Sequence, residues 1–283
     1  MDLIIPCLLN GLVSGLIYAL LAAGFNLIFG AARIVFFAHG EIYMLGAIGA
    51  YWLIMGTGIP YPLVLILVPL GVGLFGVVVE RIIFRPLRGH DFPIFVSSLA
   101  LAMIISNSAL LTFGERPKAI VSPFTGKIVL FGAVLTMDRL ILIFVSVAVI
   151  TALYLFLHRT RAGRAIRAVS QDAESAALVG ISMNRTNMQT FFIALAICAA
   201  GGVLIAPLYV VDAFMGTPVL LVTLIVVVLG GLGSFPGAII GGLLLGLIQS
   251  FGYTFIGGVT SLISFAVVII VIIFRPRGLY GRA

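Results

Sequence analysis

Two ionisable side chains, His39 and Glu41, stand at the start of an apolar run. A charged side chain at the centre of a membrane costs about 2.5–3.5 kcal/mol on insertion scales. The two groups therefore need a cavity or a partner, and Arg33 is a candidate ion-pair partner for Glu41. Two interpretations stay open: the groups line a substrate pathway, or they lie at the membrane surface and fix the start of a helix. Two side chains are too few for a metal site.

The segment 159–186 contains the residues best suited to contact a second protein. Ser170 or Asp172 can cap a short helix, because a side-chain oxygen accepts hydrogen bonds from the free N–H groups at a helix start. Gly180 is a plausible stop for that helix. The segment is either an amphipathic connector on the lipid headgroups or a helix that docks in a groove on a cytoplasmic partner. The candidate docking residues are Asp172, Glu174, Ala176, Ala177 and Gly180.

Glycines interrupt the apolar stretch 228–242, and Gly231 and Gly233 lie at the centre of the interruption. A break in a spanning helix is tolerated where it is buried in protein or lines a water-filled cavity. Both glycines are therefore candidates for the substrate pathway. The stretch does not predict a nucleotide site, because the phosphate-binding loop pattern of Gly, any four residues, Gly, Lys and Ser or Thr occurs nowhere in the chain.

The sequence does not predict an enzyme. Its histidines, His39, His90 and His158, are scattered, and no serine-hydrolase or zinc-protease motif occurs. The two cysteines, Cys7 and Cys198, lie in apolar runs and are best explained as packing residues. We expect no cofactor and no metal in this chain.

The elements that position these residues must cross a membrane. The chain is 62% hydrophobic and 9% charged, whereas soluble proteins carry about 25% charged residues. The excess of apolar side chains must face lipid. A spanning helix needs about 20 mostly apolar residues. We predict an all-α bundle in one domain, 1–283, with eight to ten spanning segments and nine as the best count, the seventh being short enough to be a broken helix. The nine segments are 6–30, 38–54, 62–84, 93–113, 138–158, 187–210, 219–232, 237–256 and 259–274.

Basic residues predict the orientation. One set of connections carries 12 of the 16 Lys and Arg residues, including those of segment 159–186. Cytoplasmic connections are the richer in Lys and Arg, so this set is expected inside, with the N-terminus outside. The net charge of +7 therefore indicates contact with membrane lipid and not with nucleic acid.

Several stretches of the chain resemble a known family, the permease subunits of ATP-binding-cassette importers for branched-chain amino acids, the high-affinity leucine, isoleucine and valine system. The most specific are Phe-Ala-His-Gly-Glu at 37–41 and Gly-Gly-Leu-Gly-Ser-Phe-Pro-Gly at 230–237. The resemblance spans nearly the whole chain. The other stretches that carry it are 15–24, 80–81, 85–88 and the part of segment 159–186 that ends at 180–181.

The resemblance implies a transport subunit in a bacterial inner membrane that works with several partners. These are a second homologous permease subunit, cytoplasmic ATPase subunits that use ATP, and a periplasmic substrate-binding protein. It also implies that segment 159–186 carries a degenerate coupling motif, in which Ser175 interrupts the expected Glu-Ala-Ala run. Two alternatives remain: a related permease for another amino acid, an amide or urea, and a secondary transporter driven by an ion gradient.

Overall fold

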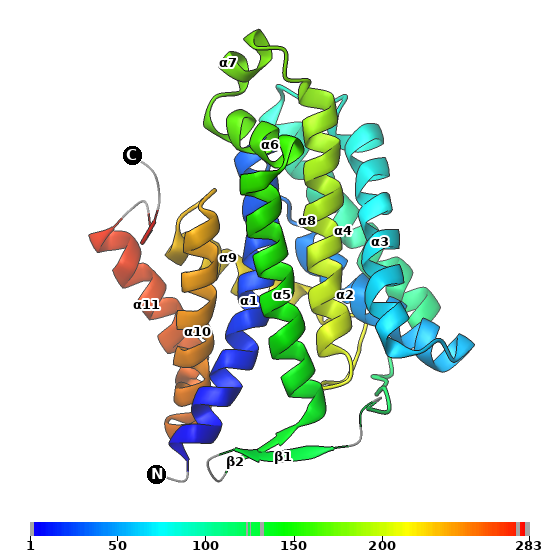
Figure 1. Cartoon of the computed structure of the whole chain (residues 1–283), viewed down its shortest axis with the longest axis vertical. Coiled ribbons are helices and arrows are strands. Elements are labelled where there is room, and N and C mark those ends of the chain that lie inside the picture. The colour runs from blue at the N-terminus through cyan, green and yellow to red at the C-terminus, as the bar shows by residue number, and fades with distance from the viewer. Residues whose placement is uncertain (1–2, 123, 125, 131–132, 276–277, 281–283) are drawn as a thin grey trace.

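The computed structural model describes residues 3–122, 124, 126–130, 133–275 and 278–280. Helices dominate it, which confirms the all-α prediction (Figure 1). The long axis of the bundle runs from the end that carries the N-terminus to the end that carries two short helices, α6 and α7. The helices are α1 (Ile4–Ala32), α2 (His39–Tyr51), α3 (Tyr61–Val79), α4 (Asp91–Phe113), α5 (Met137–Arg159), α6 (Arg161–Gln171), α7 (Ala173–Leu178), α8 (Met183–Ile205), α9 (Gly216–Gly230), α10 (Phe235–Phe255) and α11 (Thr260–Phe274).

Each of the nine predicted apolar segments coincides with a helix. Six helices in the described part of the chain are long and apolar enough to cross a membrane by themselves: α1, α4, α5, α8, α10 and α3 together with the π-helical turn Glu80–Phe84 that extends it. The other three, α2, α9 and α11, are shorter. The count of nine crossings stays a prediction, because shorter helices need not span the membrane.

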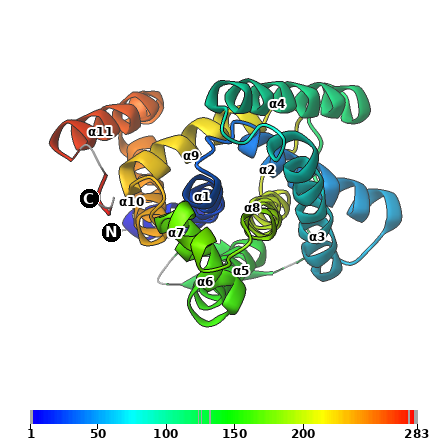
Figure 2. The ribbon, with the colours of Figure 1, turned by 90° about the horizontal axis from the view of Figure 1, so that it is seen from above.

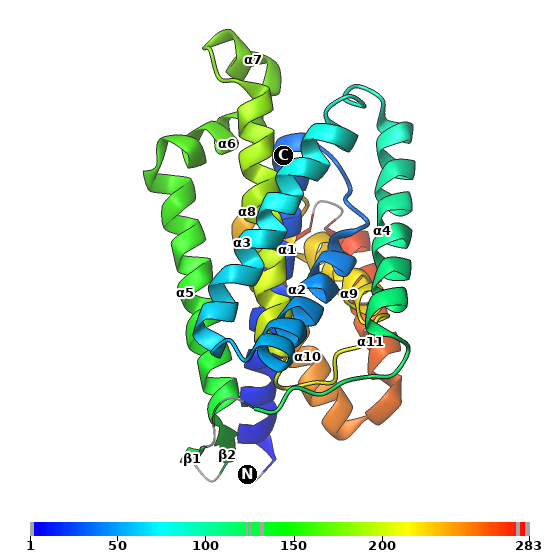
Figure 3. The same ribbon diagram turned by 90° about the vertical axis from the view of Figure 1, so that its right-hand side faces the viewer.

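Two of the shorter helices, α2 and α9, begin part-way along the bundle (Figure 3). Helix α1 ends at Arg33, whose left-handed backbone (φ 55°) turns the chain, and its N–H bonds to the carbonyl of Phe29 at 2.9 Å. Residues 33–38 then run back along the bundle before α2 starts at His39. Non-helical backbone at membrane depth is tolerated where protein surrounds it, and here Ile34, Phe36 and Ala38 are buried.

Helix α1 lies at the centre of the bundle and packs on α5, α8, α9 and α10 (Figure 2). Its closest approach is to α10. A Cβ atom added at Gly246 would collide with the backbone of Gly15, and one added at Gly242 would collide with Ala19. Small residues allow this approach, which van der Waals packing rewards in a membrane because lipid provides no hydrophobic drive. The glycine spacing thus predicted tight packing correctly.

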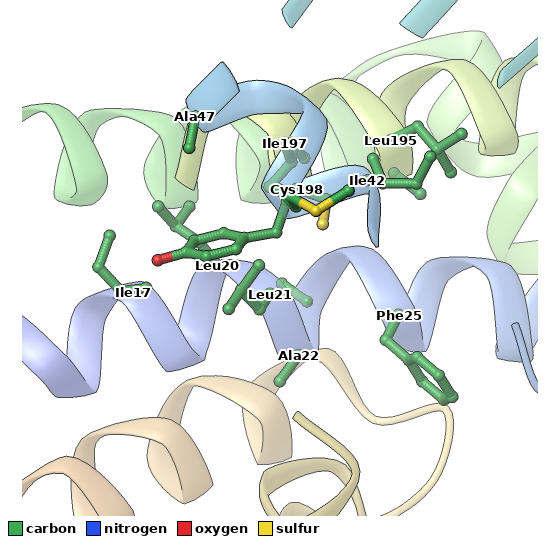
Figure 4. Close-up of a cluster of buried hydrophobic side chains, with 14 of the residues drawn as sticks. Ile17, Leu20, Leu21, Ala22, Phe25, Ile42, Ala47, Leu195, Ile197 and Cys198 are labelled. Atoms are coloured by element: carbon green, nitrogen blue, oxygen red, sulfur yellow. The ribbon is translucent and has the colours of Figure 1, made fainter. Parts of the chain in front are cut away.

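A dry core joins α1, α2 and α8, as Figure 4 shows. Leu20 and Leu21 of α1 lie against Ile42 of α2, and Leu195 and Cys198 of α8 complete the layer. Helix α2 approaches α8 at two glycines. A Cβ at Gly46 would strike the backbone of Ala199, and a Cβ at Gly202 would strike the carbonyl of Tyr43. This packing holds the short helix α2 inside the bundle.

A hairpin and a bridge close the N-terminal end of the bundle. Strands β1 (Lys127–Leu130) and β2 (Ala133–Thr136) pair antiparallel just before α5, within the long connection between α4 and α5. Lys118 and Val211 form a separate two-way backbone bridge, with N–O distances of 2.9 and 2.8 Å. We call this the hairpin end, and the opposite end, with α6, α7 and the connection 85–90, the arginine-rich end (Figure 1).

Candidate functional site

The predicted docking segment folds as two helices where the sequence analysis expected one. Thr160 caps α6 by accepting a hydrogen bond from the Gly163 N–H at 2.9 Å. The buried residues Gly163, Ile166 and Val169 recur every three positions and so lie on one face. Between them, Arg164 is exposed and Arg167 is half-buried, which makes α6 amphipathic. The prediction missed α6 because its apolar face is only three residues long.

Helix α7 begins at one of the two caps that the sequence offered, Asp172, and it ends two residues before the predicted stop, Gly180. Its cap is Asp172, which accepts hydrogen bonds from the N–H groups of Glu174 at 3.0 Å and Ser175 at 3.2 Å, and from the Ser175 hydroxyl. These hydrogen bonds, helped by the nearby charge of Arg33, lower the pKa of the Asp172 carboxyl. Gly180 follows the helix with φ +83°, a backbone conformation that suits glycine and ends helices.

The exposed face of α7 differs from the predicted docking set. Ala176 is buried, so it anchors α7 to the rest of the protein. Leu178 is 89% exposed and Val179 is 77% exposed, at the tip of the arginine-rich end (Figure 3). Glu174 and Ala177 are exposed as well. The sequence analysis did not include Leu178 or Val179, because which side of a six-residue helix faces outward depends on tertiary packing.

Glu41 lies where the starts of α2 and α9 meet. Its Oε1 accepts a hydrogen bond from the Thr217 hydroxyl at 3.3 Å, and Gly216 packs directly against its carboxylate. The Glu41 side chain is buried, and its Oε2 has no partner among the described residues. The predicted ion pair with Arg33 is wrong, because the one ion pair in the described part of the chain joins Arg88 to Glu80.

The two helix starts explain how Glu41 is accommodated without a cation. The N-terminus of a helix carries a partial positive charge from its free N–H groups. Glu41 is in the first turn of α2, and it touches the first two residues of α9. Its carboxylate thus faces two positive helix ends. Arg33 is instead exposed at the arginine-rich end, where α1 ends.

His39 is fully buried. Its Nε2–H donates to the Leu21 carbonyl of α1, with an N–O distance of 3.0 Å, because a carbonyl can only accept. The ring meets Phe25 edge-on at a centroid distance of 5.6 Å. Its Nδ1 has no partner among the described residues. These contacts give His39 a packing role between α1 and α2.

Gly231 and Gly233 form the turn between α9 and α10, at the opposite end of α9 from Glu41. Both have positive φ, 108° and 75°. Asn26 of α1 holds the turn: its Oδ1 accepts from the Gly233 N–H at 3.0 Å, and its Nδ2 donates to the Ser234 carbonyl at 2.9 Å. Fifteen residues of α9 separate the glycines from Glu41, which is about 22 Å of helix. The structure therefore does not bring the four predicted pathway residues together.

A cavity of about 380 Å³ lies beneath α6 and α7 at the arginine-rich end. Arg88 crosses its edge: its guanidinium donates to Glu80 at the end of α3 and, at 2.6 Å, to Asn184 at the start of α8. Glu80 is 1% exposed, so this ion pair is buried on one side. The lining comes from α1, α4, α6, α7, α8 and the connections that follow α1 and precede α4.

A second cavity, of about 350 Å³, lies nearer the hairpin end between α1, α5, α10 and the segment before α9. Tyr18 donates to Gln249 Oε1 at 2.7 Å, and Arg139 donates to Asn10. These polar groups satisfy one another across the cavity. Sequence reasoning missed both cavities, because their walls come from helices far apart in the chain.

Comparison with known proteins assigns the chain to a family. The family model described as branched-chain amino acid transport system, permease component, matches residues 7–273. The chain belongs to this family. The match covers all eleven α-helices almost completely, so the chain is a multi-pass membrane protein of the permease class.

Two curated members of this permease family illustrate the similarity. The chain is 33% identical to BraD of Pseudomonas aeruginosa, a high-affinity branched-chain amino acid transport system permease protein, over 97% of this chain and 95% of that protein. It is 32% identical to LivH of Escherichia coli, which carries the same description, over 96% and 94%. Among solved structures, PsaBC from Streptococcus pneumoniae in complex with Fab matches with a TM-score of 0.54 at 14% identity, covering 96% and 92%. That likeness shows the fold alone.

Proposed function

We propose that this chain is the permease subunit of an ATP-binding-cassette importer for branched-chain, hydrophobic amino acids in a bacterial inner membrane. Its full-length similarity to BraD supports this assignment most directly, since 97% of the chain aligns with 95% of that permease. The subunit pairs with a second homologous permease. A periplasmic binding protein delivers the amino acid, and cytoplasmic ATPase subunits bind and hydrolyse ATP.

Helix α7 couples this permease to its ATPase subunits. Contiguous exposed apolar surface indicates a site for a partner, and the neighbouring residues Leu178 and Val179 are both exposed at the arginine-rich end. A short helix that presents two apolar side chains suits a groove on a neighbouring protein. Movement of the ATPase subunits then reaches α6, which packs against α7, and α8, which follows α7 in the chain.

The substrate pathway passes the junction of α2 and α9. Binding sites in transporters are commonly built from helices that start within the membrane, and α2 and α9 both begin part-way along the bundle. The free Oε2 of Glu41 is an acceptor suited to the ammonium group of an amino acid. His39 positions α2, and Gly231 and Gly233 act as a turn that lets α9 move against α10.

The test is transport by the complete importer in vesicles. Radiolabelled leucine should accumulate only with the binding protein, the ATPase subunits and ATP, and collapse of ion gradients should leave uptake unchanged. Uptake that needs an ion gradient but no ATP would establish a secondary transporter instead. Competition by unlabelled amino acids, amides and urea identifies the substrate class.

Substitutions at the α7 tip test the coupling role. Leu178→Glu should lower leucine transported per ATP hydrolysed at least tenfold, because a carboxylate cannot enter an apolar groove. Leu178→Met at the same position keeps an apolar side chain and should preserve coupling. Equal coupling in both variants, with the importer fully assembled, would exclude α7 as the coupling element.

A further inference from the structure

The cavity beneath α6 and α7 has the size and chemistry of a small-molecule site. Its volume, about 380 Å³, falls within the roughly 300–1,000 Å³ range of ligand pockets. A branched-chain amino acid fits within it. The cavity opens at the arginine-rich end and not at the α2–α9 junction, so it is separate from the pathway around Glu41.

One buried side chain in the cavity lacks a partner. Asn187, in the second turn of α8, is 4% exposed, and its Oδ1 has no hydrogen-bond partner in the described part of the protein. A buried polar atom without a partner is uncommon, because leaving it unsatisfied costs about 1–3 kcal/mol. Because Asn187 lines the cavity, an N–H donor of a ligand there would satisfy this oxygen.

The rim carries charges of both signs. The guanidinium of Arg33 makes no ion pair or hydrogen bond in the described residues, although its charge lowers the pKa of Asp172. Arg88 uses two of its five N–H donors on Glu80 and Asn184. Asp91, in the first turn of α4, is the acidic residue of the lining. An anion alone would be repelled by the carboxylate of Asp91, whereas a zwitterion can pair with charges of both signs.

The floor is apolar, and it is formed by Ile34, Ile94, Phe95 and Val169 among others. An aliphatic side chain released from water into such a floor gains free energy in proportion to its buried area. The lining therefore combines an acceptor, guanidinium groups and an apolar floor. These are the three features that recognise the ammonium, carboxylate and side chain of an aliphatic amino acid.

We infer that this cavity binds a free branched-chain amino acid from the cytoplasmic side, and that occupancy slows the importer. The carboxylate binds Arg33 and Arg88, and the ammonium group binds Asn187 Oδ1 and Asp91. This inference rests on the proposed function for its substrate class and its orientation.

The position of the cavity supplies the regulatory effect. Its wall includes Val169 near the end of α6 and Ala173 at the start of α7, the helices assigned to ATPase coupling. A ligand that contacts α4 and α8 together with these residues stabilises one arrangement of the coupling helices over others. A ligand shifts such an equilibrium by its differential affinity for the two states. Imported amino acid thus limits further import.

The experiment uses the complete importer in vesicles, oriented so that the ATPase subunits lie in the lumen. The lumen holds ATP and a varied concentration of unlabelled leucine, and the initial uptake rate of radiolabelled leucine is measured. The wild-type rate should fall saturably with lumenal leucine. Isoamylamine, which lacks the carboxylate, and 4-methylpentanoate, which lacks the amino group, should inhibit at least tenfold less effectively.

Two variants locate the site. Asn187→Leu removes the acceptor while keeping the branched shape and the number of side-chain heavy atoms, and Ile94→Phe narrows the cavity. Each should raise the half-inhibiting leucine concentration at least tenfold while uptake into a leucine-free lumen persists. Leu99→Phe adds the same bulk on α4 at a half-exposed position outside the cavity, and it should behave like the wild type.

The outcomes separate the two proposals. Two results overturn this inference and leave the proposed function intact. One is an uptake rate that does not change with the lumenal leucine concentration, and the other is equal inhibition in all variants. A rate that follows the content of anionic lipid and not leucine also overturns it, since the occupant is then a headgroup. A complete importer that takes up no branched-chain amino acid refutes the proposed function itself.

Discussion

Removing Arg88 should destabilise the permease more than removing both members of its ion pair. Glu80 is 1% exposed, and Arg88 donates to the Oε1 of Glu80. The Oε2 of Glu80 has no partner among the described residues. Breaking a buried pair by deleting one partner costs about 3–5 kcal/mol, because the remaining charge stays buried. The Arg88 side chain is 27% exposed, which places the Arg88→Ala cost near the lower limit, about 3 kcal/mol.

The double variant tests the cause of that cost. In Glu80→Gln/Arg88→Ala the buried group is neutral, so we expect a loss of only about 1 kcal/mol, near that of Glu80→Gln alone. The difference of about 2 kcal/mol corresponds to roughly a 30-fold change in the ratio of folded to unfolded protein. The assay is reversible denaturation of the purified permease in mild detergent, arranged as a double-mutant cycle. If Arg88→Ala is as stable as the double variant, the buried carboxylate is not the source of the instability.

Three further predictions follow from particular contacts. Asp172→Ala should lower leucine transported per ATP hydrolysed, whereas Asp172→Asn keeps a capping oxygen and should match the wild type. Hydrogen bonding lowers the pKa of the Asp172 carboxyl in the folded state. The helix cap is therefore complete above the unfolded pKa of about 3.9 and is lost only below it. A ratio of leucine transported to ATP hydrolysed that changes between pH 5 and 8 would contradict this. Gly246→Ala should destabilise the permease by about 1–3 kcal/mol in the same detergent assay, because the added methyl group overpacks against Gly15. Gly71→Ala has open space around it and should be tolerated. Equal stability of the two variants would refute the close approach of α1 and α10. Glu41→Gln should keep the Thr217 hydrogen bond yet lower leucine uptake at least tenfold with the ATPase subunits still bound, and unchanged uptake would remove Glu41 from the pathway.

Local signals predicted more of this protein than long-range ones could. Apolar length alone placed the nine helical segments, because each spanning helix must satisfy its own backbone in lipid. The cap at Asp172 and the stop at Gly180 were equally predictable, since both depend on residues within one helical turn. The glycine spacing on α10 indicated a close helix contact but not its partner.

The sequence could not predict which distant segments contact each other. Glu41 contacts Thr217, 176 positions later in the chain, so the adjacent Arg33 seemed the better partner. Exposure of Leu178 and burial of Ala176 depend on how α7 sits on the bundle. The partnerless oxygen of Asn187 appears only when five helices and two connections close around a cavity.

The most direct test of the central claim measures transport without the ATPase subunits. Vesicles would contain this chain and its partner permease, with binding protein and leucine outside, an imposed ion gradient, and no ATPase subunits. We predict no accumulation of leucine above its external concentration, and uphill accumulation on adding the ATPase subunits and ATP. Concentrative uptake by the permease subunits alone would contradict the account.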